Sequence, residues 1–529
     1  MAARRAAHLR RTSARVSGPG WRPGRDPRAE WHAPAGGAAH DGQRHHVAVV
    51  GGGIAGLSAA TALAERGVRV TLLERGDRLG GRVASWPVTV DGTTTAMSRG
   101  FHAFFRQYYN LRSLLRRTDP ALERLHAVED YPLSLKDGPT DSFTGIALTP
   151  PLNIVSFVLR SPTFRLRDLA AVDVGAAMEL LDVDFPATFE RYDGVSAAAY
   201  LDRLRFPDQA RHLALEVFAR SFFADARDFS AGELVAMFHS YFLGSAEGLL
   251  FDVPVDDYDT ALWAPLGRHL DGLGAEVRTG EAVESVTSAG DGALDVLTGA
   301  GSTRVDGVVL ALDRAPLQQL VSASPGLGDD AWRASLAAQR SAPPFAVWRL
   351  WLDRRVAPGS APFRATSGFG PLDNVSVLEL LEEGAARWTG EHDGSVVELH
   401  AYALEPAADV QALRERLWRE LLVLHPELDG ARIRHEEWLW RDDCPLVGTE
   451  PWASRPGVVT PDPRVVLAGD GVRCELPVAL MERAATTGFQ AADRLLASYG
   501  VTGHGVWTVP TSHRHRVVPT LARFLDKRG

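Results

Sequence analysis

The chain has 529 residues, of which 45% are hydrophobic, so it is long enough for two or three domains with extensive cores. Its formal net charge of -9, and a body without a basic stripe interleaved with aromatic residues, exclude nucleic acid as an expected partner. The two cysteines, Cys444 and Cys474, cannot form a disulfide framework, which indicates a cytoplasmic protein. The spacing of its His and Cys residues predicts no metal site.

Residues 1–44 differ in composition from the rest of the chain. They hold nine arginines against three acidic residues, among many Ala, Gly and Pro. This composition predicts a disordered basic tail. A secretory signal would need an apolar segment that this stretch lacks, whereas an Arg-rich transit peptide stays open as an alternative.

A short apolar strand, Val47 to Val50, leads directly into a glycine-rich turn and a helix. Gly51, Gly53 and Gly56 follow in the spacing G-x-G-x-x-G. We expect the first glycine to make the tight turn, the second to let the backbone approach a pyrophosphate, and the third to let the helix lie close to the strand. The sequence therefore predicts a dinucleotide-binding fold.

A second strand, Val68 to Leu73, ends at Glu74. An acid about twenty residues after the glycines is placed to bind the 2′-hydroxyl of a ribose. Glu74 therefore favours an unphosphorylated ribose, as in FAD or NAD, over NADP. The uncharged run from Val47 to Ala64 has 18 residues and is also near the lower limit for a membrane span, but its clustered glycines favour a buried strand and helix.

The middle of the chain alternates between two kinds of sequence pattern. Residues 101–251 are rich in Phe, Tyr and Leu, with helical spacing at 108–117 and 209–223, and predict a substrate-side helical region. From Ala264 to Asp313 a helix, a glycine turn and strands return, as in a nucleotide-binding domain. Residues 347–352 and 396–404 then predict strands of an antiparallel sheet, and residues 464–496 predict a strand, a turn and a helix.

These elements predict an α/β fold with a discontinuous Rossmann-like domain. We expect residues 45–100, 258–315 and 455–500 to form this nucleotide-binding domain. Residues 101–257 and 316–454 would form an inserted α+β substrate domain of helices and an antiparallel sheet. Residues 501–529 would form a C-terminal tail.

Two further motifs suit a flavin nucleotide. Gly80-Gly81-Arg82 would bring backbone close to a cofactor and place a guanidinium for bidentate contact with phosphate, although the motif also suits an ordinary surface turn. Asp470 closes an apolar strand, where a carboxylate can hold ribityl hydroxyls. A helix opens at Met481, and its N-terminus would stabilise negative charge on a reduced flavin ring.

Together these motifs resemble the flavoprotein family of amine oxidases, protoporphyrinogen oxidases and carotenoid desaturases, over about Val47 to Leu496. The resemblance implies FAD as the cofactor, with pyrophosphate on the glycine turn, adenine against Val283 and the flavin end on Asp470 and Met481. The residues implied to bind FAD are Gly51, Gly53, Gly56, Glu74, Arg75, Gly81, Arg82, Arg99, Gly100, Val283, Asp470 and Met481.

The run Gly100-Phe101-His102-Ala103-Phe104-Phe105, followed by RQYYNL, is similar to carotene desaturases and most of all to bacterial carotenoid φ-ring synthases. In these relatives an acid usually precedes the glycine, whereas this chain has Met97-Ser98-Arg99. The resemblance implies aromatisation of the β-ionone ring of β-carotene, with loss of four hydrogens and migration of one methyl group. Such a reaction passes through a carbocation.

Aromatic side chains would stabilise that cation by about 0.5–2 kcal/mol each, and a dry pocket would discourage its capture by water. The candidates for this wall are Phe101, Phe104, Phe105, Tyr108 and Tyr109. His102 is the candidate proton acceptor, because neutral imidazole accepts a proton at physiological pH. Plain core packing of the aromatic residues and a structural histidine remain alternatives.

A carotenoid substrate resides in the bilayer, so we expect peripheral docking on the inner face of the cell membrane. Pro151 to Leu159 and Phe238 to Leu250 are candidate apolar lips of the substrate entry. The acceptor that reoxidises the flavin is not identified by the sequence, and a quinone is one candidate.

Alternative hypotheses are that the chain is an amine oxidase, another carotene desaturase or isomerase, or a flavin-containing binding module without turnover. Many amine oxidases use a lysine at the flavin. The chain has only Lys136 and Lys527, and neither is well placed for that role. Attachment of the flavin through Cys444 is a further alternative.

Overall fold

The computed structural model describes residues 22–163, 179–205 and 222–513. The predicted helical stretch 209–223 falls mostly outside these residues. The predicted helix at 108–117 is confirmed as α3 (Tyr109–Leu115).

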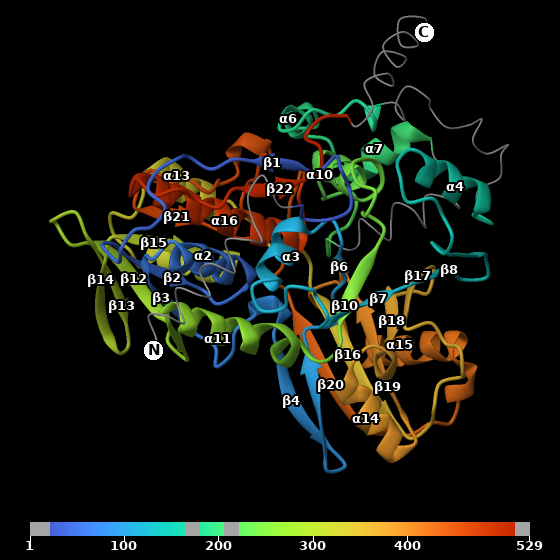
Figure 1. The fold of residues 1–529 in the computed structure, drawn as a ribbon. Helices are drawn as coiled ribbons and strands as arrows, with labels where there is room; N and C mark the ends of the chain where they lie inside the picture. The colour runs from blue at the N-terminus through green and yellow to red at the C-terminus, as the bar shows by residue number, and fades with distance from the viewer. Residues whose placement is uncertain (1–21, 164–178, 206–221, 514–529) are drawn as a thin grey trace, which may run out of the picture.

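A parallel sheet of five strands forms the centre of the nucleotide-binding domain (Figure 1). Its order is β11 (Glu276–Thr279), β3 (Arg69–Glu74), β2 (His46–Val50), β15 (Gly307–Leu310) and β21 (Val465–Leu467). Every residue of β2 and β15 is buried, as expected for central strands of a sheet covered on both faces. The carboxyl ends of β2, β15 and β21 meet at one edge, where turns carry the polar residues of the site.

Two helices pack tightly on this sheet, α2 (Ile54–Glu65) and α16 (Leu480–Ser498). A Cβ added at Gly488 of α16 would lie 2.3 Å from the carbonyl oxygen of Ala55, so glycine permits this close approach. The apolar run from Val47 to Ala64 is thus divided between buried β2 and buried α2. Within the part of the chain that the structure describes, no helix is long and apolar enough to cross a membrane.

The remaining elements of this domain lie beside the parallel sheet. A three-stranded antiparallel sheet consists of β12 (Val283–Ser288), β13 (Leu294–Thr298) and β14 (Gly301–Val305). The helices α11 (Ala264–Leu273), α12 (Arg314–Ser322) and α13 (Asp330–Ala337) complete it. The prediction that the substrate domain resumes at residue 316 is therefore wrong for residues 316–337, because α12 and α13 pack in the core of the nucleotide-binding domain.

The second domain is built on a sheet of seven strands. Its order is β20 (Ile433–Arg441), β16 (Phe345–Leu352), β19 (Ser395–Ala401), β18 (Asn374–Val377), β17 (Phe363–Ser367), β8 (Leu133–Leu135) and β9 (Thr140–Asp141). All pairs are antiparallel except β17 with β8. One face packs on α15 (Val410–Leu424), so alternate residues of β16 and β19 face the rest of the molecule.

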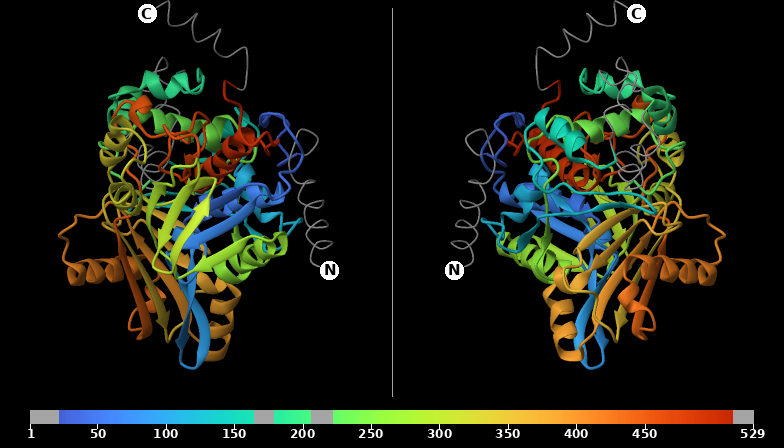
Figure 2. Two further views of the ribbon diagram at one scale, coloured as in Figure 1. Left: turned by 90° about the vertical axis from the view of Figure 1, so that its left-hand side faces the viewer. Right: turned by 90° about the vertical axis from the view of Figure 1, so that its right-hand side faces the viewer.

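The hairpin β4 (Ser85–Val90) and β5 (Thr93–Ser98) projects beside α14 (Glu383–His392) of this second domain (Figure 2). The predicted nucleotide-binding segment 45–100 therefore contains a hairpin that packs on the substrate domain. The reason is that the Ser98 hydroxyl and the Ala96 carbonyl of β5 accept hydrogen bonds from the buried Arg349 of β16.

A mainly helical layer lies beside α16, at the opposite end of the molecule from the hairpin of β4 and β5 (Figures 1 and 2). It contains α4 (Leu152–Arg160), α6 (Ala187–Arg191), α7 (Ala197–Leu204) and α10 (Ala231–Phe238), with the strands β6 (Phe104–Phe105), β7 (Leu125–Val128) and β10 (Phe251–Pro254). The predicted entry lip at Phe238 to Leu250 is wrong, because most of these residues are buried; α10 packs on α6 and α7, and Ser240 is bonded to the backbone of Pro477. The other candidate lip, on α4, does expose apolar side chains.

The prediction of disorder over residues 1–44 is wrong for residues 22–44. The strand β1 (Glu30–His32) pairs with β22 (Val506–Thr508), which also lies in the predicted C-terminal tail. Ala29 and Trp507 pack with Tyr109 in a small apolar cluster. Burial of these side chains supplies the free energy that orders both segments despite their composition.

Candidate active site

One cavity of about 1200 Å³ runs from the carboxyl edge of the parallel sheet to the seven-stranded sheet. Its volume exceeds the ~300–1,000 Å³ typical of small-ligand pockets, which indicates space for more than one small ligand. The nucleotide-binding domain contributes glycine turns and charged side chains, and the second domain contributes mostly aromatic ones.

The glycine turn after β2 forms one end of the cavity. Gly51 has φ of +108°, and a Cβ added there would lie 2.2 Å from the carbonyl oxygen of Ala311. Gly53 faces the second glycine turn, where the Cα of Gly81 would lie 3.8 Å from an added Cβ. Among the described residues no side chain caps the N-terminus of α2, so its N–H groups are available to an anion such as a phosphate.

Gly56 does not line the cavity, but it makes the turn possible. A Cβ added at Gly56 would lie 1.9 Å from the carbonyl oxygen of Gly51. This is the close contact of helix and strand that the spacing predicts.

The end of β3 and the start of β12 form the outer part of this region. Glu74 accepts hydrogen bonds from the backbone N–H groups of Gly52 and Gly76, each at 2.7 Å, and lines the cavity together with Arg75. Val283 lines the cavity as well. The structure thus brings together the residues expected at an adenosine.

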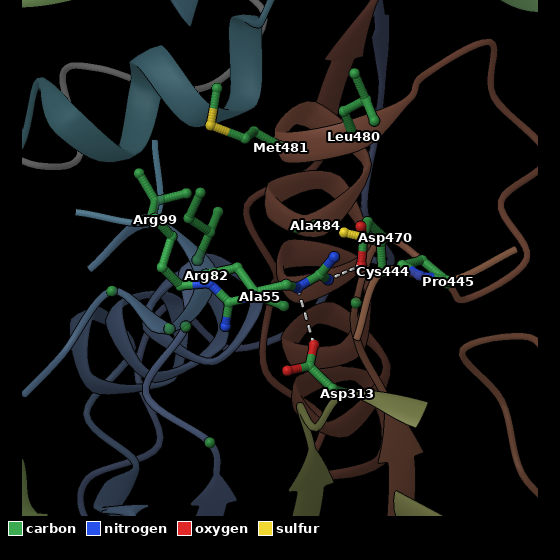
Figure 3. A pocket seen from close by; sticks show the side chains of 18 of the residues that line it. Ala55, Arg82, Arg99, Asp313, Cys444, Pro445, Asp470, Leu480, Met481 and Ala484 are labelled. Carbon is green, nitrogen blue, oxygen red and sulfur yellow. Dashed lines mark hydrogen bonds and ion pairs between the residues drawn. The ribbon is translucent and has the colours of Figure 1, made fainter. Parts of the chain in front are cut away.

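Arg82 lies deeper, between two carboxylates (Figure 3). Its guanidinium bonds Asp470, and its Nε lies 3.0 Å from Asp313. Burial alone would lower the pKa of Arg82, but Asp470 and Asp313 raise it well above its usual value. Asp313 was missed by sequence reasoning, although its place directly after the buried strand β15 is the signal that identifies Asp470 after β21.

Arg99 and Cys444 lie in the same region (Figure 3). Arg99 pairs with Asp443, but its Nε is buried and has no hydrogen-bond partner among the described residues. Because Arg99 lines the cavity, this N–H group is available to an acceptor on a bound ligand. Burial raises the pKa of Cys444 to about 12, so its sulfur stays a thiol, which disfavours covalent attachment of a cofactor.

The first turn of α16 closes this part of the cavity with Met481 and Ala484 (Figure 3). Gly100, in contrast, does not line the cavity. Its φ of +104° carries the chain past His400, whose Cε1 would lie 2.5 Å from an added Cβ. Gly100 therefore shapes the backbone, and nothing places it against a cofactor.

Three of the predicted aromatic residues line the cavity: Phe101, Phe105 and Tyr108. Phe101 stacks on Phe363 at a centroid distance of 4.4 Å, and Phe105 meets the edge of Tyr241 at 4.7 Å. The residues that line the wall are therefore held by other rings.

The wider prediction is wrong for Phe104 and Tyr109, which are buried elsewhere. Phe104 packs beside Tyr258, and Tyr109 belongs to the cluster with Trp507. The alternation along β6 turns Phe104 away from the side on which Phe105 lies.

His102 lines the cavity with its ring fixed at one nitrogen. Its Nδ1 lies 2.7 Å from the carbonyl oxygen of Gly100, so Nδ1 carries the proton. Its Nε2 has no hydrogen-bond partner among the described residues. Burial lowers the pKa of His102 to about 4, and the ring is therefore neutral, with a free lone pair at Nε2.

A row of polar side chains that sequence reasoning missed lies on one face of β19 and its continuation: Glu398, His400 and Tyr402. His400 and Tyr402 line the cavity, and Glu398 is fully buried behind them. The motif E-x-H-x-Y places all three on one face of a strand, which is the signal that could have found them.

The chain matches a protein family along most of its length. The profile described as "Flavin containing amine oxidoreductase" matches residues 54–496. A carotenoid phi-ring synthase of Streptomyces griseus is 55% identical over 515 residues, which cover 97% of this chain and 100% of that protein. A carotenoid phi-ring synthase of Chlorobaculum tepidum is 26% identical and covers 85% of this chain and 88% of its own.

Solved structures show the same fold. A putative protoporphyrinogen oxidase from Exiguobacterium sp. 255-15 has a TM-score of 0.56 at 18% identity, covering 86% of this chain and 99% of that one. Cyclohexylamine oxidase from Brevibacterium oxydans IH-35A has a TM-score of 0.58 at 15% identity, covering 86% and 98%. The resemblance expected from the glycine turn and the Gly100 to Phe105 run is thereby confirmed, and the chain belongs to the flavin-containing amine oxidoreductase family.

Proposed function

We propose that this protein is an FAD-dependent carotenoid desaturase that aromatises the β-ionone ring of β-carotene with migration of one methyl group, forming a φ-ring. The observation that carries this proposal is the 55% identity to a carotenoid phi-ring synthase over the whole length of that relative. The cavity agrees with it, because a nucleotide-type cradle continues directly into an aromatic chamber.

The residues of the cradle fit FAD. The Gly51 turn and the start of α2 suit the pyrophosphate, Glu74 suits the ribose, and Arg82 supplies a cation beside them. Val283 lies where adenine would pack, whereas Asp470 and Met481 suit the ribityl chain and the ring. When bound, the flavin supplies the acceptor for hydride equivalents, and we propose a membrane quinone as the final acceptor.

The residues that line the aromatic part of the cavity would stabilise the cation and accept its proton. Phe101, Phe105 and Tyr108 present rings to a cationic carbon, and their packing keeps water away from it. His102 offers a neutral, unpartnered Nε2 as a proton acceptor. No oxygen atom is added in this scheme, which is why exclusion of water matters.

The test is expression in a bacterium that accumulates β-carotene, followed by mass and absorption analysis of the pigments. Species lighter by four and eight hydrogens, with an aromatic ring fragment, would support the proposal. Unchanged β-carotene beside a purified, FAD-loaded protein would contradict it, and linear carotenes and amines would be the next substrates to try.

Amine oxidation finds no support in the lysines. Lys136 pairs with Glu420 at 2.5 Å and does not line the cavity, and Lys527 lies outside the described residues. Within the part of the chain that the structure describes, no lysine is therefore available at the flavin end.

Substitution of His102 by glutamine should lower the rate of φ-ring formation about 100-fold. This is the lower end of the range of about 100-fold to 10,000-fold expected for loss of a general base. Flavin content should stay unchanged.

Because the pKa of His102 is lowered to about 4, the neutral acceptor is present above that pH. The wild-type rate should therefore hold from pH 8 to about pH 5 and fall towards pH 4. The matched control is His126→Gln, because His126 lies in β7 and does not line the cavity. Equal rates of the His102 and His126 variants would contradict the role of His102.

We also propose that α4 docks the protein on the membrane surface. Leu152, Val155 and Leu159 are 61%, 51% and 67% exposed and share one face of α4, whereas Phe157 on the other face is buried. An amphipathic helix of this kind lies in the membrane interface.

The double change Leu152→Asp and Leu159→Asp should reduce flotation with lipid vesicles several-fold and leave flavin content unchanged. Val423→Asp, at a residue of α15 that is 55% exposed, introduces one aspartate at another exposed apolar residue and should bind vesicles like the wild type. Equal flotation of both variants would exclude α4 as the docking helix.

A further inference from the structure

We propose that Tyr402 is a second catalytic proton acceptor of the ring reaction, and that His400 and Glu398 form a relay behind it. This proposal rests on the proposed function, because the proton concerned is one that leaves the aromatising ring. It concerns residues outside the motifs that carry the family resemblance.

The three side chains form a continuous hydrogen-bonded row. The Oη of Tyr402 lies 2.6 Å from the Nδ1 of His400, and the Nε2 of His400 lies 2.8 Å from Glu398. Glu398 in turn accepts a hydrogen bond of 2.8 Å from the Nε of Arg349. The row thus leads from the cavity wall to a buried carboxylate.

The charges fix the direction of each hydrogen bond. Burial would raise the pKa of Glu398, but Arg349 and His400 lower it to about 2, so this group is a carboxylate. The Nε2 of His400 therefore donates to Glu398, and its Nδ1 accepts the hydroxyl proton of Tyr402. The N–H of Phe101 donates to Glu398 at 2.8 Å, which is closer than the 3.3 Å to His400.

Tyr402 is held in place at the cavity. Its Oη accepts a hydrogen bond of 3.0 Å from the side-chain amide of Asn374, and its ring meets the edge of Phe223 at a centroid distance of 4.7 Å. Burial raises the pKa of Tyr402, so it is a neutral phenol before the reaction. The remaining oxygen lone pair is the one that can accept a proton.

The step balances without a further reactant. The C–H bond of the cationic ring breaks, and its electron pair becomes the new C=C π bond. The released proton binds the Oη of Tyr402 while the phenolic proton moves to the Nδ1 of His400. The imidazolium that results is stabilised by the carboxylate of Glu398.

The reaction needs more than one proton transfer. Loss of four hydrogens from one ring corresponds to two hydride equivalents and two protons. His102 and His400 flank the same backbone residue, since His102 bonds the carbonyl of Gly100 and His400 crowds its Cα. Two residues that line the cavity, His102 and Tyr402, therefore each carry a candidate proton acceptor, Nε2 and Oη.

The experiment compares variants of the full-length, FAD-loaded protein with β-carotene in vesicles, in normal and in deuterated water. Tyr402→Phe keeps the ring and its packing but removes the proton-transferring oxygen. His400→Gln can keep both hydrogen bonds but cannot take up a proton. Tyr192→Phe is the matched control, because Tyr192 is buried away from the cavity and bonds Glu179.

We expect φ-ring formation to fall about 100-fold in Tyr402→Phe and in His400→Gln, with unchanged flavin content, and to stay unchanged in Tyr192→Phe. The wild type should show a solvent deuterium isotope effect from the moving phenolic proton, and both relay variants should lose it. A merely structural His400 would be rescued by glutamine and would leave the isotope effect in place.

A rate of Tyr402→Phe within twofold of the wild type would overturn the relay while the proposed function stands. If Tyr402→Phe fails to retain flavin, the rate and isotope effect of His400→Gln decide the question. A wild-type protein that holds FAD but leaves β-carotene unchanged would overturn the proposed function, and the relay with it.

Discussion

Replacement of Gly56 by alanine is expected to give a protein that does not retain flavin. The added Cβ would lie 1.9 Å from the carbonyl oxygen of Gly51. Because this contact is with the backbone of Gly51, it cannot move aside as a flexible side chain can. Relief requires α2 to shift away from β2, and overpacking of this kind costs about 1–3 kcal/mol or more. The shift would also displace the N–H groups at the start of α2 that suit the pyrophosphate. Flavin absorbance per protein and urea unfolding measure the two effects.

Gly390→Ala is the matched control for this change. Gly390 lies in α14, and an added Cβ would meet nothing within 4 Å. The same substitution there should leave flavin content unchanged and raise stability by up to about 1 kcal/mol, because alanine favours the helix. Wild-type flavin content in Gly56→Ala would show that α2 can move without loss of the cofactor site.

The sequence predicted the nucleotide end of the site well because its signals are local. Gly51, Gly53, Gly56 and Glu74 belong to one strand, turn, helix and strand, so their spacing determines their positions in space. The match to the flavin-containing amine oxidoreductase family agrees with the predicted flavin cofactor. The individual contacts to FAD stay predictions.

The substrate end was less predictable because its residues meet only through the register of the seven-stranded sheet. Arg349 of β16 lies opposite Glu398 of β19, and nothing local to either strand reveals this pairing. The order of residues 22–44 was likewise hidden, because β1 pairs with a strand more than 450 residues later in the chain. Composition reports local tendency, whereas long-range pairing decided the outcome there.

Replacement of Arg349 by methionine should strongly destabilise the protein. The Arg349 side chain is 1% exposed and that of Glu398 is 0% exposed. Arg349 also donates to the backbone of Ala96 and, at 3.0 Å, to Ser98, and so ties β5 to the substrate sheet. Removal of one partner of a buried ion pair typically costs about 3–5 kcal/mol, since the other charge stays buried. Denaturant unfolding at pH 7 measures the loss.

The pH dependence of unfolding gives this variant a distinctive signature. In the wild type, the pKa of Glu398 is lowered to about 2, so its contribution to stability is present above about pH 4.5 and is lost as the pH falls towards 2. Without Arg349, burial acts on Glu398 with less opposition, and its folded-state pKa rises. If that pKa exceeds the unfolded value, the variant gains stability as the pH is lowered from 8 towards 5, where the wild type gains nothing from this group.

A double change, Arg349→Met with Glu398→Gln, tests whether the unpaired carboxylate is the cause. It should recover part of the lost stability, because no buried charge is then left without a partner. Arg355→Met serves as the surface control, since Arg355 and Asp393 form an exposed pair and its loss should change stability little. If the double variant is no more stable than Arg349→Met, the loss comes instead from the bonds to Ala96 and Ser98, and Arg349 acts chiefly by holding β5 against the substrate sheet.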